Sequence, residues 1–119
     1  MAELWEGFYG SYMSGSDGQG FAMFIFAGGA IAGADPLGVK FDGTYETLED
    51  GSLTGKVTVT VPPGGTVIQG ASAGPAGMKY EVAIAFAPNA FALDFVKLDT
   101  PLGPVNLRMS KLRELGPAR

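Results

Sequence analysis

The densest group of ionisable side chains in this sequence is acidic. Glu46, Glu49 and Asp50 lie close together and are followed by Gly51. Carboxylates on a connection between strands can dock against Lys and Arg side chains of a partner through charge-assisted hydrogen bonds. A solvated turn prefers the same residue types, with Asp50 and Gly51 making the bend. The sequence leaves both interpretations open.

Catalytic chemistry has little support in the sequence. Paired carboxylates occur in glycosidases, but Glu46 and Glu49 have no aromatic platform for a sugar nearby in sequence. The chain has no histidine and no cysteine, so the commonest general base, the commonest metal ligand and any thiol nucleophile are missing. The Gly-rich stretch 62–77 lacks the phosphate-binding pattern G-x-x-x-x-G-K-[ST]. We predict that the protein is not an enzyme and uses no cofactor or metal.

Aromatic residues recur at positions that an alternating pattern places on the inner face of strands. Such rings can pack a core, and rings that line a cavity for a small apolar ligand would give the same pattern. The candidate cavity-lining residues are Trp5, Tyr9, Phe41, Tyr45, Tyr80 and Phe86.

Short antiparallel strands are predicted to position these side chains. Apolar residues recur with a period of two in runs bounded by Gly, Pro, Asn or Asp, and no segment has a convincing helical pattern. Between two of these runs, Gly28 and Gly29 suit a two-residue hairpin turn. The predicted strands span residues 4–13, 21–27, 30–34, 39–46, 53–61, 78–87, 90–98 and 105–112.

Eight sequential strands with short turns predict an all-β fold, a small antiparallel up-and-down β-barrel. Glycines repeated once per strand in the first half favour the curling that closes such a sheet. We expect one domain over residues 1–113 and a tail over residues 114–119. A barrel of this size is filled by side chains or holds one small ligand. The stretch 62–77 is expected to form a short strand or a plug over an open barrel end.

Two predicted strands carry apolar residues on their outer as well as their inner faces. The run 21–27 is apolar on both faces, and the outer face of 78–87 ends in small apolar residues. A soluble monomer rarely exposes a large contiguous apolar surface, and a second copy is the common cover. We therefore predict a homodimer with Phe24, Phe26, Ala83 and Ala85 at its interface.

The charge distribution is uneven along the chain. The net charge is −4, which argues against direct binding of nucleic acid. Residues 1–50 hold eight acids against one base, whereas residues 51–119 hold four acids against seven bases. This asymmetry favours a basic partner for the first half or serves solubility alone.

The expected location is the cytoplasm. The first residues lack the basic and apolar regions of a secretory signal. The uncharged stretch 21–34 has 14 residues, whereas a membrane helix needs about 20. We therefore predict no membrane association.

The glycine and aromatic spacing in the first half resembles the GrlR-like family, negative regulators of type III secretion. The resemblance rests on Gly7-x-Tyr9, on Gly20, on segment 29–35 as a Gly-x-x-x-Gly-x-Asp hairpin, and on Gly43-x-Tyr45. It covers about the first 60 residues, and beyond residue 61 only the strand alternation is compatible.

The resemblance implies a lipocalin-like, calycin-like barrel with an apolar cavity, a plug-like loop and a dimer held by barrel walls. Members of the family sequester a DNA-binding transcriptional activator, a role tied to an acidic surface loop. Glu46, Glu49 and Asp50 would correspond to that loop, although Thr47 and Leu48 interrupt the run of acids that is contiguous in the family.

Two functional hypotheses follow. The first is a non-enzymatic dimeric barrel that binds a basic helix-turn-helix regulator through its acidic loop. The alternative is a carrier or sensor of a small apolar ligand, such as a lipid, held inside the barrel and gated by the stretch 62–77.

Overall fold

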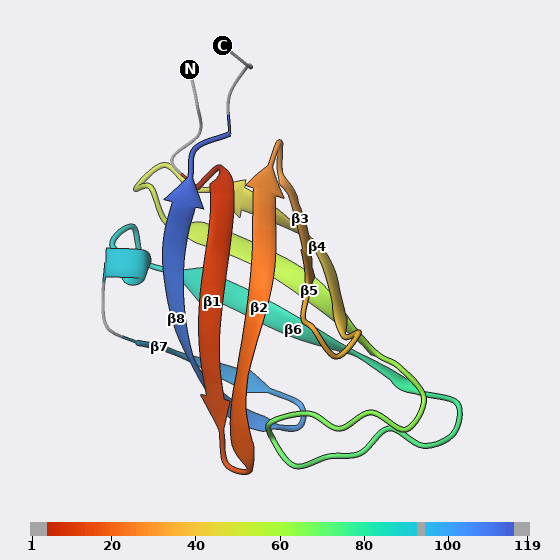
Figure 1. Cartoon of the computed structure of the whole chain (residues 1–119). Coiled ribbons are helices and arrows are strands. Elements are labelled where there is room, and N and C mark those ends of the chain that lie inside the picture. Colours follow the sequence, from red (N-terminus) through yellow and green to blue (C-terminus); the bar gives the residue numbers. More distant parts are fainter. Residues whose placement is uncertain (1–4, 93–94, 116–119) are drawn as a thin grey trace.

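The computed structural model describes residues 5–92 and 95–115, which form an all-β structure. Its strands follow one another along the chain with one short 3-10 helix between the sixth and the seventh (Figure 1). The strands are β1 (Gly7–Gly15), β2 (Gly18–Ala27), β3 (Ala30–Ala34), β4 (Lys40–Thr47), β5 (Leu53–Val61), β6 (Met78–Phe86), β7 (Val96–Thr100) and β8 (Gly103–Arg113), and the 3-10 helix is η1 (Ala90–Ala92).

All eight strands belong to one antiparallel sheet in the order β6-β5-β4-β3-β2-β1-β8-β7. Neighbours in sequence are neighbours in the sheet, and β8 returns to pair with β1. β6 and β7 stand at the two ends of this order and pack against each other without a shared ladder. The predicted small up-and-down β-barrel is confirmed, as a barrel that is nearly closed.

Turn chemistry fixes several strand boundaries. Gly28 and Gly29 have φ values of 58° and 84°, and two central residues with positive φ are what a type I′ hairpin requires. The bounds predicted for residues 30–34 and 53–61 coincide with β3 and β5. The other strands differ from prediction by a few residues, and Leu4, the predicted start of the first strand, lies outside the described residues.

The predicted strand 90–98 is wrong in its first part. Residues 90–92 form η1, residues 93–94 lie outside the described residues, and β7 begins only at Val96. Ala90 is buried and its backbone N–H donates to the carbonyl of Ala87. This turn directs Phe91 against the aromatic rings at one end of the barrel.

The core fills the interior of the barrel because alternate side chains of each strand point inward. The two ends of the barrel differ. The turns β2–β3, β4–β5 and β6–β7 lie at the end where β1 begins and β8 ends, here called the terminal end (Figure 1). The turns β1–β2, β3–β4 and β7–β8 and the long connection 62–77 lie at the opposite end, here called the loop end (Figure 1). No helix among the described residues is long and apolar enough to cross a membrane.

Candidate ligand cavity

An apolar cavity of about 380 Å³ lies inside the barrel toward its loop end. Its walls are mainly inward-facing aromatic and branched aliphatic side chains from β2, β4, β5, β6 and β8. Among them are Phe24, Phe41, Val57, Val59, Val82 and Ile84.

The period of two along the strands produces these walls. On β5 the side chains of Val57 and Val59 point inward and are buried, whereas Lys56, the residue before Val57, points outward and is exposed. β6 repeats the pattern with Val82 and Ile84 buried. Val82 pairs directly with Val57 across the two strands, and such cross-strand β-branched pairs stabilise a sheet.

Packed aromatic rings close the barrel at its terminal end. Phe91 contacts Trp5, Tyr9 and Phe86 with ring centroids 5.0, 5.3 and 5.1 Å apart. All three contacts have edge-to-face geometry, the arrangement that the ring quadrupoles favour. The indole N–H of Trp5 donates to the carbonyl of Gly51 at 3.1 Å, which ties this cluster to the β4–β5 turn.

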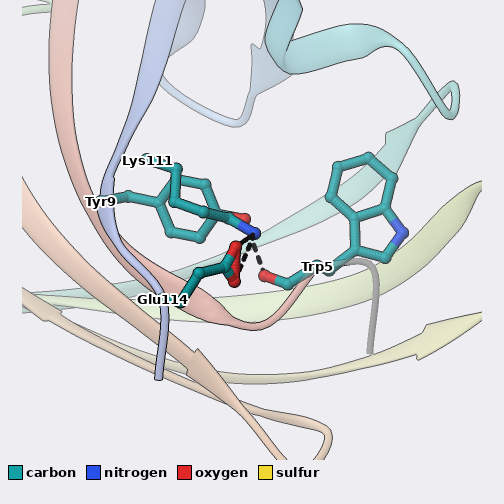
Figure 2. A network of polar contacts seen from close by, with 4 residues as sticks. All are labelled: Trp5, Tyr9, Lys111 and Glu114. Atoms are coloured by element: carbon teal, nitrogen blue, oxygen red, sulfur yellow. Dashed lines mark hydrogen bonds and ion pairs between the residues drawn. The ribbon is translucent and has the colours of Figure 1, made fainter. Parts of the chain in front are cut away.

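Polar contacts join Trp5 and Tyr9 of this cluster, and Lys111 to Glu114 beside them (Figure 2). The Tyr9 hydroxyl donates to the carbonyl of Trp5 at 2.7 Å, and the Lys111 Nζ lies 5.7 Å from the centre of the Tyr9 ring. Lys111 pairs with Glu114 at 2.9 Å. Burial raises the pKa of Tyr9 to about 12, with smaller contributions from the charge of Glu114 and from Tyr45.

The long connection 62–77 lies over the loop end, and part of it lines the cavity through Thr66, Val67, Ile68 and Gln69. Main-chain bonds fix its position: the Asp17 N–H in the β1–β2 turn donates to the Ile68 carbonyl at 3.0 Å. The predicted placement of this stretch over a barrel end agrees with these contacts.

A small group of hydrogen-bonded polar side chains lies at the loop end of the mainly apolar cavity. The Gln69 side-chain Nε2 donates to Thr100 Oγ1 at 3.1 Å and makes a longer contact of 3.4 Å with the Tyr80 hydroxyl. Burial raises the pKa of Tyr80, and the hydrogen bond from Gln69 opposes that shift. Tyr80 is therefore a neutral phenol at physiological pH.

The aromatic residues predicted to line a cavity divide into two groups. Phe41, Tyr80 and Phe86 line it, whereas Trp5, Tyr9 and Tyr45 are buried in the core outside its lining. The prediction omitted the polar residues Gln69 and Thr100. No strand periodicity marks Gln69, because it lies in a connection that only the folded barrel brings over the cavity.

The predicted placement of Phe24 and Phe26 on the outer surface is wrong. Both are buried and line the cavity. Phe24 pairs directly with Tyr9 of β1, and directly paired residues of antiparallel strands lie on the same side of the sheet. Because Tyr9 points inward, Phe24 and Phe26 do so too.

The outer apolar surface instead lies over β1, β2 and β8. It contains Tyr12, Phe21, Ile25 and Leu112, which we call the outer wall. Tyr12 is 63% exposed and Leu112 54%, and the rings of Tyr12 and Phe21 lie 5.2 Å apart. Ala83 and Ala85 of β6 are exposed on the outer surface as predicted, but three strands separate β6 from β2.

Glu46, Glu49 and Asp50 are all exposed at the terminal end of the barrel. The Asp50 Oδ1 accepts hydrogen bonds from the Ser52 hydroxyl and from the Ser52 N–H, the latter at 2.9 Å. These bonds lower the pKa of Asp50. The turn is therefore ordered by its own aspartate, as the solvated-turn interpretation expects, and it also presents its carboxylates to solvent.

Comparisons with known proteins returned no match to a family model, a curated protein or a solved structure. The resemblance to the GrlR-like family stays a prediction.

Proposed function

We propose that this protein binds a small apolar molecule inside its barrel. The observation that supports this function best is the cavity of about 380 Å³ with almost entirely apolar walls. Ligand pockets typically measure about 300–1,000 Å³ and combine apolar walls with a few polar groups. A guest that fills this cavity gains about 0.8 kcal/mol for each methylene group removed from water.

The two barrel ends suit a carrier or a sensor. Aromatic rings fill the terminal end, whereas hydrogen bonds and a few side chains hold the connection 62–77 over the loop end. Loops held by few contacts open at low free-energy cost. A ligand would therefore enter and leave at the loop end.

Displacement of the neutral fluorescent probe N-phenyl-1-naphthylamine tests this function. We expect saturable binding of the probe and competition by linear alcohols, with affinity rising about fourfold per added methylene until the cavity is full. Native mass spectrometry of protein purified from its source should detect a co-purifying small molecule.

A cavity-filling substitution provides the matched comparison. Val82→Phe places a ring into the cavity, whereas Ala83→Phe places the same ring on the outer surface one residue away. We expect Val82→Phe alone to abolish probe binding while both variants remain folded by circular dichroism. Equal binding by Val82→Phe, Ala83→Phe and the unchanged protein would refute the cavity as the site.

A second candidate function is docking of a basic protein through the acidic turn, the role that the GrlR-like resemblance implies. Glu46, Glu49 and Asp50 are exposed at one end of the barrel, and the Trp5 indole and Ser52 brace the turn that carries them. A braced turn loses little conformational entropy on binding. This supports a surface that meets a Lys- and Arg-rich partner such as a helix-turn-helix activator.

Affinity purification from the source cells tests this second function. We expect a triple Ala variant at Glu46, Glu49 and Asp50 to lose a partner that the unchanged protein retains at low salt. A triple Ala variant of the exposed acids Asp17, Asp42 and Glu81 removes the same charge elsewhere. Retention of the same partners by both variants would refute docking through this turn.

A further inference from the structure

Within the part of the chain that the structure describes, the lining of the cavity contains an acidic side chain and no basic one. Among the described residues that line the cavity, none is Lys or Arg, and Asp35 carries the only carboxylate. The Asp35 Oδ1 accepts hydrogen bonds from the N–H groups of Leu37 and Val39 at 2.9 and 3.0 Å. This carboxylate shapes the β3–β4 turn and offers an anion no favourable partner.

The polar group at the loop end has hydrogen-bonding capacity to spare. Thr100 Oγ1 accepts from Gln69 Nε2 and from the Leu102 N–H, and it donates to the Gly103 carbonyl at 2.6 Å. Gln69 and Tyr80 are less fully engaged. Within the described residues, the Tyr80 hydroxyl proton has no acceptor and the Gln69 side-chain oxygen has no donor.

A hydroxyl group matches this arrangement. Its oxygen can accept the Tyr80 proton, and its own proton can be donated to the Gln69 Oε1. A carboxylate can accept from Tyr80, but it cannot donate to Gln69, and no cation in the lining would compensate the loss of its hydration.

We propose that the cavity selects apolar molecules with an uncharged, hydroxyl-type head group and discriminates against free carboxylates. The inference rests on the proposed function, because it assigns the head group of a ligand in that same cavity. The apolar part of the ligand lies among the valines and phenylalanines, and the head group lies beside Gln69 and Tyr80.

Two probes of equal chain length test this selectivity. Competition of 1-decanol and decanoate with the fluorescent probe, at pH 8 where the acid is ionised, should show the alcohol binding at least about tenfold more tightly. Decylamine serves as the cationic third probe.

Two substitutions locate the head group. Tyr80→Phe removes one hydrogen bond and should weaken binding of 1-decanol about two- to tenfold. Gln69→Arg places a cation beside the head group and should reverse the preference in favour of decanoate. Ser72→Arg adds the same charge to an exposed position of the same connection and should leave the preference unchanged.

The outcomes separate the two proposals. Binding of the fluorescent probe with equal affinities for alcohol and carboxylate would overturn the head-group inference and leave the cavity function intact. Tighter binding of decylamine would overturn it in favour of Asp35 as the head-group partner. Absence of any binding, by the probe and by all three amphiphiles, would overturn the proposed function and this inference with it.

Discussion

Tyr9 connects the barrel interior to the charged residues at the terminal end. Its ring packs against Phe26 and Phe91, and its hydroxyl donates to Trp5. Its pKa is about 12 in the folded protein and about 10 in an unfolded chain. The folded state therefore favours the neutral phenol.

The sign of the resulting pH dependence follows from this raised pKa. The contribution of the neutral Tyr9 phenol to the free energy of unfolding is fully present below pH 10. It is lost as the pH rises from 10 to about 12, which lowers the free energy of unfolding by about 2–3 kcal/mol in total. Urea unfolding of the unchanged protein and of Tyr9→Phe, followed by the single tryptophan, measures this difference. We expect a shallower decline between pH 10 and 12 for Tyr9→Phe, and parallel declines would contradict the assignment to Tyr9.

Ser11 places a hydroxyl group in the core where an apolar side chain would serve better. Its side chain is 0% exposed, and its Oγ has no hydrogen-bond partner among the described residues. It pairs with Ala22 and Met109 on the two neighbouring strands. A buried polar group without a partner costs about 1–3 kcal/mol.

Ser11→Ala should therefore stabilise the protein. We expect the free energy of unfolding to increase by about 1 kcal/mol, measured by urea denaturation. Ser110→Ala, an exposed serine on β8, should change it by less than about 0.5 kcal/mol. A loss of stability in Ser11→Ala would show that the hydroxyl is satisfied by a buried water.

At the scale of elements, the contact between β1 and the connection 62–77 controls the loop end. A Cβ atom at Gly15 would lie 2.5 Å from the Ile68 carbonyl oxygen, closer than real contacts allow. At Gly18, across the same turn, a Cβ atom would meet only Ile68 Cγ2 at 4.0 Å. Gly15 thus permits the connection to lie close to the β1–β2 hairpin.

Gly15→Ala should displace the connection and speed ligand release. We expect the dissociation rate of the fluorescent probe, measured by stopped flow, to rise about fivefold, as the loss of one hydrogen bond of about 1 kcal/mol implies. Gly18→Ala should dissociate at the unchanged rate. The same rate in both variants would mean that this contact does not limit ligand release.

For strands with one apolar face, the sequence predicts which side chains point inward. For strands that are apolar on both faces, it does not. β5 alternates valine with threonine and lysine, so its bounds and its inner face follow from the period of two. β2 is apolar on both faces, so only its pairing with Tyr9 of β1 decides that Phe24 points inward. For η1, the sequence Ala-Phe-Ala gives no signal that distinguishes a strand from a turn.

The residues of the candidate site that lie on strands with one apolar face were predictable from the same period of two, and those in connections were not. Phe41, Tyr80 and Phe86 lie on strands in which inward and outward residues alternate, and that pattern predicted them. The polar group of Gln69 and Thr100 depends on contact between segments 31 residues apart in the chain. Local sequence contains no information on such a contact.

At the scale of the whole molecule, the outer wall departs from the polar surface expected of a soluble monomer. Tyr12, Phe21, Ile25 and Leu112 form a group of exposed apolar side chains over β1, β2 and β8. Exposed apolar groups of this kind mark interaction surfaces. A second copy of the chain is the cover that we expect.

Sedimentation velocity of two charge variants tests this expectation. Ile25→Glu buries an unpaired charge in such an interface and should weaken dimerisation by more than about tenfold. Ala83→Glu introduces the same charge on β6 and should leave the dimer intact if the interface lies on the outer wall. A monomer at all concentrations of the unchanged protein would refute the dimer.

The sheet order leaves a single seam where β6 and β7 meet without a ladder. Every other strand boundary must break several main-chain hydrogen bonds in order to separate, whereas the seam separates by parting side chains alone. Deuterium uptake should therefore begin along β6 and β7 and reach β3 and β2, in the middle of the sheet order, last. We therefore expect the barrel to open first at this seam, with the middle strands of the sheet still paired.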